Sequence, residues 1–502
     1  MTEKSVIVVG GGVAGLTAAA LLAYEGNEVI LLEAHAQTGG CAGTFTRGPY
    51  VFDVGATQVA GFEKGGIHDR IFRHLHCSKP EAEVLDPACI VHLGEGQEPI
   101  HLWHDSLKWE EERKKHFPGS ELFWMLCNQL HRSNWSFAGS DPILPIQNLW
   151  DLKQFLNSSR SMNFLTGAFT RSSIADLLWL CSCNHDQHLR KFLDCQLKLY
   201  SQEPSNKTAA LYGATVLQMA QAPLGLWHLK GSMQKLSDQL LFCFLRDGGK
   251  LLLSHKVVGL SKNTNTWQLE VNTHKKLPLK FQAKNVVFTL PPQSLLELIP
   301  HTSSGLPKSY RDRLETLSQP TGAIVFYGAI TRRHLPSYCA GHFQLLLEEL
   351  GSIFISISFE GDGRAPIGQA TVIASLFTDV TSWSAYSRSE YQQRKDLILE
   401  KILKVLNAQF AIESKQWLHK ELATPRSFAR WTGRPQGIVG GLAQTPTTFG
   451  PFGLPSRTPM KGLWLCGDSI YPGEGTAGVS QSALMACRQL MSEEGREFTL
   501  TK

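Results

Sequence analysis

The sequence predicts an α/β fold, with a nucleotide-binding domain on a parallel sheet and an inserted α+β domain. Residues 5–9 (SVIVV) form a continuous β-branched run followed at once by a glycine-rich turn, as expected of a strand buried on both faces. A second apolar run that ends in glycine, residues 462–467, lies near the other end of the chain. The chain has 502 residues, more than one hydrophobic core usually serves, so we expect two domains.

Composition argues against several classes of protein. The net charge is +5, from 49 basic and 44 acidic residues, which is too small to predict nucleic-acid binding. The 11 cysteines are scattered, and a chain of this size needs no disulfides, so we expect reduced and mostly buried thiols. The Cys/His cluster at residues 181–195 has C-x-C and H-x-x-H spacings that fit zinc poorly, so we predict no metal site.

Two uncharged stretches are long enough to raise the question of a membrane span. Residues 5–24 carry three successive glycines at their centre. Residues 208–229 include Gln218 and His228, which are costly in hydrocarbon. Neither stretch is predicted to span a bilayer, and no A-x-A cleavage pattern is evident. We therefore expect a protein that is soluble or lies on a membrane surface.

The N-terminal segment matches a dinucleotide-binding βαβ unit in each of its parts. The strand at residues 5–9 is followed by G-x-G-x-x-G at residues 10–15. A helix of small residues runs to about residue 24, and a second apolar strand covers residues 28–32. All parts are in register, so the segment predicts nucleotide binding far more strongly than the glycines alone.

Each position of the turn has a physical role. Gly10 permits the tight turn, Gly12 lets the backbone approach a pyrophosphate, and Gly15 allows the helix to pack closely on the strand. Val13 and Ala14 open the helix, whose N-terminus offers free N–H groups and a positive dipole end to phosphates.

Glu33 ends the second strand, 23 residues after Gly10. Its carboxylate can accept hydrogen bonds from the adenosine ribose hydroxyls. An acid at this position disfavours NADP because it would repel a 2'-phosphate. This half of the site does not by itself separate NAD from FAD.

The glycine doublet Gly39-Gly40, with Cys41 and Thr44 behind it, resembles the G-G-R-x-x-T/S signature of the flavin amine oxidase and phytoene desaturase superfamily. In that superfamily the doublet lets the chain pass close to the FAD diphosphate and ribitol. Here Cys41 replaces the usual arginine, which removes a cation that would face phosphate. Neutral residues occur there in the carotenoid branch.

The C-terminal segment resembles the second FAD motif of that superfamily. An apolar strand ends in Gly467-Asp468, and a glycine-rich loop leads to a helix that runs on from Ser480. The resemblance implies that Asp468 accepts a hydrogen bond from a ribitol hydroxyl and that the helix points its N-terminus at the pyrimidine edge of the flavin. Further contacts with the isoalloxazine ring, the adenine and the helix start are implied for Gly55, Ala56, Thr57, Val257, Gly478 and Val479.

The FAD motifs occupy three separate stretches. They predict a discontinuous Rossmann-type FAD-binding domain, like that of flavin amine oxidases and phytoene desaturases, at residues 1–75, 220–295 and 455–502. The two insertions, residues 76–219 and 296–454, are predicted to form an α+β substrate-binding domain.

The inserted regions are rich in bulky apolar residues, such as 123–126 (FWML), 177–180 (LLWL) and 324–327 (IVFY). Most will be ordinary core, but together they suit a long apolar ligand better than a polar one. Amine oxidases present an aromatic cage or carboxylates to a charged substrate, and no such cage can be placed in this sequence.

Over nearly its whole length the chain resembles the phytoene desaturase and carotenoid isomerase family, and within it the carotenoid C-3',4'-desaturases of the cyanobacterial type. The segments that carry this resemblance are 54–61, 65–68, 148–152, 196–202 and 473–478. It implies removal of two hydrogens from the C-3',4' bond of a 1'-hydroxylated carotenoid, toward myxol-type products, with quinone or oxygen as electron acceptor. A lipophilic substrate also implies peripheral association with the cytoplasmic side of the cell or thylakoid membrane.

Glu474 is the candidate for a polar or basic role beside the flavin, although a loop carboxylate that only orders the motif would fit its position as well. A carotenoid cis–trans isomerase that uses reduced FAD is the nearest alternative function. A flavin amine oxidase is the second alternative, and a non-enzymatic flavin-binding partner protein is the third.

Overall fold

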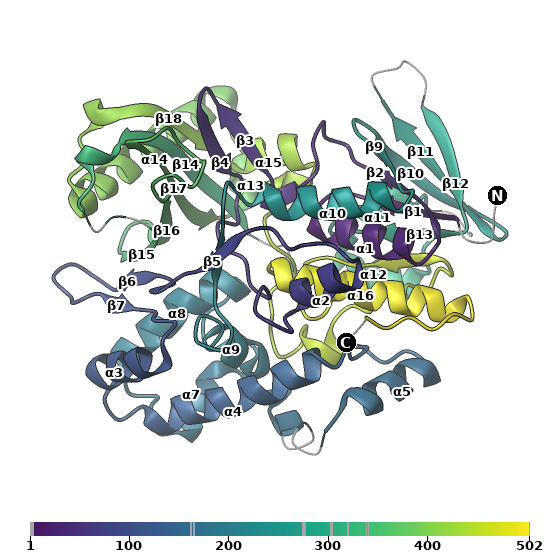
Figure 1. Cartoon of the computed structure of the whole chain (residues 1–502), viewed down its shortest axis with the longest axis horizontal. Coiled ribbons are helices and arrows are strands. Elements are labelled where there is room, and N and C mark those ends of the chain that lie inside the picture. The colour runs from purple at the N-terminus through teal and green to yellow at the C-terminus, as the bar shows by residue number, and fades with distance from the viewer. Residues whose placement is uncertain are drawn as a thin grey trace.

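The computed structural model describes residues 5–160, 163, 166–273, 278–301, 305–318, 321–337, 339 and 341–500. A five-stranded sheet organises the right-hand half of the molecule in Figure 1. All of its strand pairs are parallel, so the predicted α/β fold is confirmed. Its strands, in order, are β19 (Leu463–Leu465), β13 (Asn285–Phe288), β1 (Ser5–Val9), β2 (Glu28–Leu32) and β9 (Lys250–Leu252).

Three helices from distant stretches of the chain form a layer beside this sheet (Figure 1). Helix α1 (Val13–Tyr24) packs between α10 (Gln234–Arg246) and α16 (Thr476–Glu493). Every residue of α1 from Val13 to Ala23 is buried, so this helix needs partners on all sides. The domain is therefore assembled from both ends of the chain and its middle.

Smaller elements complete this half of the molecule. An antiparallel sheet packs its buried Trp267 into the core that β1 and β13 share. Its strands are β10 (Lys256–Asn263), β11 (Thr266–Asn272) and β12 (Leu279–Ala283). The other elements are β3 (Thr44–Arg47), β4 (Tyr50–Asp53), α2 (Ile67–His74), β5 (Ala82–Val84), β8 (Trp227–Leu229), α11 (Leu295–Leu298) and α12 (Lys308–Glu315).

A seven-stranded sheet joins the two inserted regions, because β6 of the first pairs in parallel with β15 of the second. Its strands, in order, are β18 (Trp417–Ala423), β14 (Gly322–Thr331), β17 (Gln369–Thr378), β16 (Gly351–Ile357), β15 (Gly341–Leu347), β6 (Ile90–His92) and β7 (Ile100–His101). Helix α14 (Arg388–Phe410) packs on one face of this sheet, and α13 (Val380–Ala385) and α15 (Pro425–Thr432) lie near its edge.

A helical layer lies below both sheets in Figure 1. It consists of α3 (Ser106–His116), α4 (Glu121–Ala138), α5 (Leu149–Ser158), α7 (Ile174–Leu180), α8 (Gln187–Ser201) and α9 (Ala210–Val216). Aromatic side chains, among them Trp109, Trp124 and Phe192, fill its core. Within the described ranges, no helix is both long and apolar enough to cross a bilayer.

Candidate functional site

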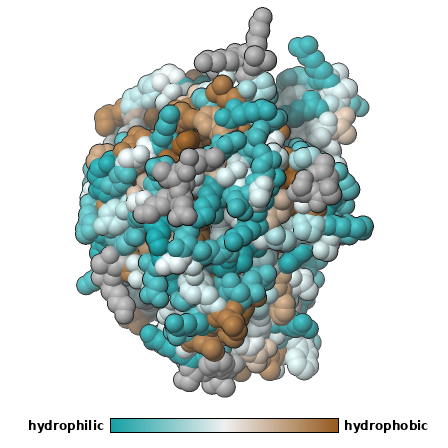
Figure 2. Space-filling model, turned by 90° about the vertical axis from the view of Figure 1, so that its right-hand side faces the viewer, coloured by the Kyte–Doolittle hydropathy of each residue, from teal (hydrophilic) through white to brown (hydrophobic). Residues whose placement is uncertain are grey.

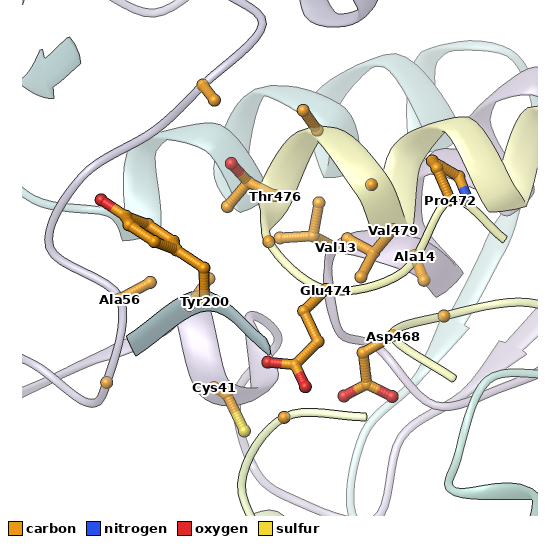
Figure 3. A pocket seen from close by; sticks show the side chains of 18 of the residues that line it. Val13, Ala14, Cys41, Ala56, Tyr200, Asp468, Pro472, Glu474, Thr476 and Val479 are labelled. Atoms are coloured by element: carbon orange, nitrogen blue, oxygen red, sulfur yellow. The ribbon is translucent and has the colours of Figure 1, made fainter. Parts of the chain in front are cut away.

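A cavity of about 950 Å³ lies where the parallel sheet, the helical layer and the large sheet meet. Its walls come from the glycine-rich turns, from the C-terminal motif and from apolar side chains of the inserted regions. All the predicted site residues line it except Gly15 and Val257. Figure 3 shows the carboxylates of Glu474 and Asp468 directed toward the space beside Cys41.

The turn between β1 and α1 lets the backbone itself form part of the wall. Gly10 has a φ of 103°, which side-chain-bearing residues rarely adopt. A Cβ at Gly15 would lie 1.9 Å from the Gly10 carbonyl oxygen, so only glycine lets α1 begin this close to β1. A Cβ at Gly12 would meet nothing closer than 4.0 Å, because this residue faces the cavity. The first turn of α1, with Val13 and Ala14, lines the cavity, and phosphate binding stays its predicted role.

Glu33 lies at the end of β2, beside this turn. Its Oε2 accepts a hydrogen bond from the Gly11 N–H at 2.6 Å, and its Oε1 accepts one from the His35 N–H at 2.7 Å. Burial raises the pKa of Glu33, while these backbone donors work in the opposite direction. Its carboxylate lies in the cavity wall, and ribose recognition stays its predicted role.

A second glycine turn faces the first. The N–H of Gly39 donates to the carbonyl oxygen of Gly11 at 2.8 Å, and a Cβ on Gly40 would come within 3.2 Å of the Gly12 Cα. Both Gly39 and Gly40 have positive φ, at 120° and 57°. Thr44 opens β3 and lines the same wall. The two turns therefore leave backbone, rather than side chains, to contact a cofactor.

Asp468 follows β19 through Gly467, whose φ is 123°. Its Oδ2 pairs with Nη1 of Arg434 at 2.8 Å, and the same guanidinium contacts the thiol of Cys41. Burial raises the pKa of Cys41, although Arg434 works against that shift, so the thiol stays protonated. Sequence reasoning missed Arg434. The usable signal is an arginine set between Gly433 and Gly437, just before the C-terminal motif.

Glu474 is held by the helical layer as well as by its own loop. Its Oε1 accepts hydrogen bonds from Nε2 of Gln202 and from the Gly441 N–H, the latter at 3.1 Å. Gln202 Oε1 accepts from the Thr321 N–H at 2.8 Å, which fixes the orientation of the amide. Burial raises the pKa of Glu474 well above its usual value, and Asp468 adds to this. Gln202 was singled out only as part of a family resemblance.

Helix α16 begins earlier than the sequence predicts. Its first residue is Thr476 rather than Ser480, so Gly478 and Val479 lie in its first turns and face the cavity. A Cβ at Gly478 would lie 2.3 Å from the Gly473 carbonyl oxygen, which explains why glycine is needed there. The isoalloxazine-facing segment predicted from the sequence also lines the cavity, at Gly55, Ala56 and Thr57.

Val257 does not reach the cavity wall. It lies in β10, and its buried side chain packs in the core with Ile7 and Val9. The position of β10 is set by its pairing within the antiparallel sheet, and not by the nucleotide-binding turns. The predicted contact of its backbone with adenine stays a prediction.

Much of the remaining cavity wall is apolar. Tyr327 donates its hydroxyl to the Val54 carbonyl oxygen at 2.6 Å, and Tyr212 donates to that of Tyr200 at 2.7 Å. Because these hydroxyls are satisfied, the rings offer mainly apolar surface. Other apolar side chains on the wall are Leu211, Val216, Met219, Val325, Phe354, Leu376 and Phe377.

The comparison with known families decides the class of the protein. The family described as flavin containing amine oxidoreductase matches residues 13–491. The chain belongs to this family. It is therefore an FAD-dependent oxidoreductase, and FAD is its cofactor, as the sequence predicts. The cavity fits FAD, because two glycine turns and the N-terminus of α1 line it with backbone and the carboxylate of Asp468 lies in the same wall.

Similar proteins cover nearly the whole chain of this flavoprotein. Prolycopene isomerase 2 of an Oncidium hybrid cultivar is 25% identical over 99% of this chain and 85% of its own. The prolycopene isomerase of Arabidopsis thaliana is 23% identical, over 98% and 83%. All-trans-retinol 13,14-reductase of Danio rerio is 22% identical, over 100% and 88%.

Solved structures show the same fold. A putrescine oxidase triple mutant superposes with a TM-score of 0.67 at 16% identity, over 98% of this chain and 99% of that one. An oxidoreductase from Methanosarcina mazei gives a TM-score of 0.63 at 17% identity, over 96% and 99%. Among the described residues, no group of three or more His, Cys, Asp and Glu side chains is arranged to hold a metal ion.

Proposed function

We propose that this flavoprotein acts on the conjugated chain of a carotenoid, and that it removes two hydrogens from the C-3',4' bond of a 1'-hydroxylated substrate. The observation that carries the proposal is the cavity, which is lined by the cofactor-binding turns together with many apolar side chains of the inserted regions. A hydrocarbon ligand fits such a largely apolar wall.

FAD supplies the hydride-accepting chemistry, and the chain's own residues supply orientation and proton handling. The apolar side chains of the cavity wall would fix which carbons lie beside the cofactor-binding turns and would keep water away from them. We propose that Glu474 takes the proton from the carbon next to the one that loses the hydride. Its carboxyl lies in the wall between Gln202 and Asp468. We propose quinone or oxygen as the final electron acceptor.

Isomerisation is a second candidate function, and the relatives favour it. Prolycopene isomerases match 98–99% of this chain, whereas the desaturase assignment depends on short resembling segments. Both reactions use the same cofactor and a ligand of the same shape. They differ in whether the product has lost two hydrogens.

Pigment analysis after incubation of the FAD-loaded protein separates these functions. The protein with oxidised FAD receives a 1'-hydroxylated carotenoid and a quinone, whereas the protein with reduced FAD receives a poly-cis carotenoid under anaerobic conditions without an acceptor. Desaturation predicts a product two hydrogens lighter with a longer-wavelength absorbance, whereas isomerisation predicts an altered spectrum at unchanged mass. Peroxide release from amines, with both carotenoids returned unchanged, would refute both candidates and favour an amine oxidase.

We also propose that an anionic bilayer receives the apolar face of α5. Leu149 is 83% exposed and Leu156 is 53% exposed on this helix, whose Phe155 lines the cavity. In Figure 2, hydrophobic side chains gather near the lower end of the face, at the level of α5 in Figure 1. The exposed charges described between residues 142 and 173 are all basic, namely Lys153, Arg160 and Arg171. Such a surface suits anionic lipid, and binding there would bring the cavity wall at Phe155 close to the bilayer in which a carotenoid dissolves.

Flotation with liposomes tests this surface. We expect the protein to float with phosphatidylserine-containing vesicles, and the double variant Leu149→Glu/Leu156→Glu to lose at least about tenfold in binding, because two carboxylates would face hydrocarbon. Leu397→Glu on α14, an exposed position on a different face, is the matched control and should bind normally. Equal flotation of all three proteins, or of none, would refute the proposal.

A further inference from the structure

We propose that Arg434 is a cofactor-facing cation that strengthens the binding of reduced FAD more than that of oxidised FAD, and so raises the reduction potential of the enzyme. This inference rests on the FAD site and is independent of the carotenoid substrate. Nothing in the family match assigns a role to this residue.

The loop that carries Arg434 is built to fix its side chain. It begins where α15 ends at Gly433, and the backbone has a positive φ at Gly433, Gln436, Gly437 and Gly440. A Cβ on Gly437 would lie 1.8 Å from the carbonyl oxygen of Pro425, so the loop is pressed against its own helix. The backbone that carries the Arg434 side chain is therefore held in a fixed conformation.

One nitrogen of the guanidinium has no hydrogen-bond partner in the part of the chain that the structure describes. Nη1 pairs with Asp468 at 2.8 Å, Nη2 donates to the Gly440 carbonyl oxygen, and the group also contacts the Cys41 thiol. Nε is buried and has no hydrogen-bond partner among the described residues. Arg434 also lines the cavity together with the two glycine turns. A buried arginine with an unused donor at a cofactor wall is suited to a ligand that brings an acceptor or a negative charge.

The adjacent carboxylate keeps Arg434 charged in this part of the cavity wall. Burial works against a charged guanidinium, yet the adjacent Asp468 carboxylate raises the pKa of Arg434 above its usual value. Burial raises the pKa of both the Cys41 thiol and the Glu474 carboxyl, which favours their neutral forms. Asp468 is therefore the one charge that balances Arg434 here. Two-electron reduction adds negative charge to a flavin, and a fixed cation stabilises that form.

The test is a set of variants whose FAD affinities are measured in the oxidised and reduced states, together with the midpoint potential. Arg434→Gln leaves Asp468 without its cation, so we expect reduced FAD to bind about tenfold more weakly relative to oxidised FAD, a fall of about 30 mV for a two-electron couple. Arg434→Lys keeps the charge and should retain most of the potential. Asp468→Asn should raise the potential, and the double variant Arg434→Gln/Asp468→Asn should lie near the wild type.

A purely structural role predicts a different pattern. If Arg434 only holds its loop, Arg434→Gln and Arg434→Lys will lower the thermal unfolding temperature equally, and the potential of bound FAD will not move. That result would overturn the proposal. If Arg434→Gln fails to fold, Asp468→Asn still decides the proposal, since it should have a higher potential than Arg434→Lys, and equal potentials in both would contradict a cation that faces the flavin.

Discussion

Two carboxylates share one wall of the cavity, and their different partners assign them different tasks. Asp468 faces a guanidinium, whereas Glu474 is held by the amide of Gln202 and one backbone N–H. Neutral donors leave the burial of Glu474 largely uncompensated, which is why its pKa lies well above the usual value. Acids whose surroundings differ in this way are typical of sites that transfer protons.

Replacing Glu474 tests its role as a base. The base must be ionised, so the wild-type rate should rise with pH through the raised pKa of Glu474, above the usual 4.5. Glu474→Gln should lower turnover by about 10²–10⁴-fold and abolish that rise, while FAD content stays normal. Steady-state rates across pH provide the measurement.

The matched control is Glu421→Gln, since Glu421 also lines the cavity but is paired with Arg47. It should keep both the rate and its pH dependence. A Glu474→Gln enzyme with an unchanged acid limb would show that Glu474 only orders its loop.

At the scale of elements, local sequence patterns were sufficient to predict the strands and helices of the nucleotide-binding half. The second strand occupies residues 28–32 as predicted, and the first helix ends at Tyr24, also as predicted. Periodicity, turn glycines and helix-end residues predict these elements, because all of these signals are close together in the sequence. The large sheet had no such signal, because β6 pairs with β15 across some 250 residues. Arg434, and the contact of Gln202 with Glu474, were missed for the same reason, since these partners are brought together only by the fold.

The close approach of α1 to β1 makes Gly15 the most sensitive position of the first turn. Gly15→Ala would drive a methyl group against the Gly10 carbonyl, so the helix must move away and its N-terminus must leave the phosphate site. We expect FAD affinity to fall at least about 100-fold, or about 2.7 kcal/mol. Fluorescence titration of the apoprotein measures this.

Gly94→Ala is the control for Gly15→Ala. A Cβ at Gly94 would meet its nearest neighbour, Gln97, at 3.6 Å, which is ordinary contact. The Gly94→Ala variant should bind FAD as the wild type does. Normal FAD binding by Gly15→Ala would show that the first turn tolerates displacement and is not the phosphate site.

At the scale of the whole molecule, a buried ion-pair network joins the FAD-binding half to the large sheet. Arg364, which follows β16, pairs with Asp53 at 3.0 Å and with Asp362 at 3.2 Å. Asp362 also contacts His228 at 3.1 Å, and Asp53 accepts from the Met233 N–H at 2.9 Å. The network therefore ties the hairpin of β4 to the start of α10 and to the inserted region.

Breaking this network should be costly. Arg364→Met would leave Asp53 buried without its partner, and we expect a loss of about 3–5 kcal/mol in the free energy of unfolding. Burial already raises the pKa of Asp53, and Arg364 is the chief group that lowers it. The variant's Asp53 should therefore take up a proton on folding, so the deficit shrinks as pH falls toward 3.8 and grows as pH rises.

Urea unfolding at several pH values measures the effect. Arg47→Met, which breaks the partly exposed pair with Glu421, is the matched control and should cost no more than about 1 kcal/mol. Equal losses for the two variants would mean that the buried network contributes no more than a surface pair.

The assembly of α1 between α10 and α16 has a consequence for the order of events during synthesis. Helix α1 is apolar all round, yet one of its covering helices is made only when the ribosome reaches residues 476–493. Until then the nascent chain carries an uncovered apolar helix and only half of a cofactor site. FAD can be captured firmly only after Asp468 and α16 have left the ribosome, so cofactor loading is a late, post-translational step for this protein.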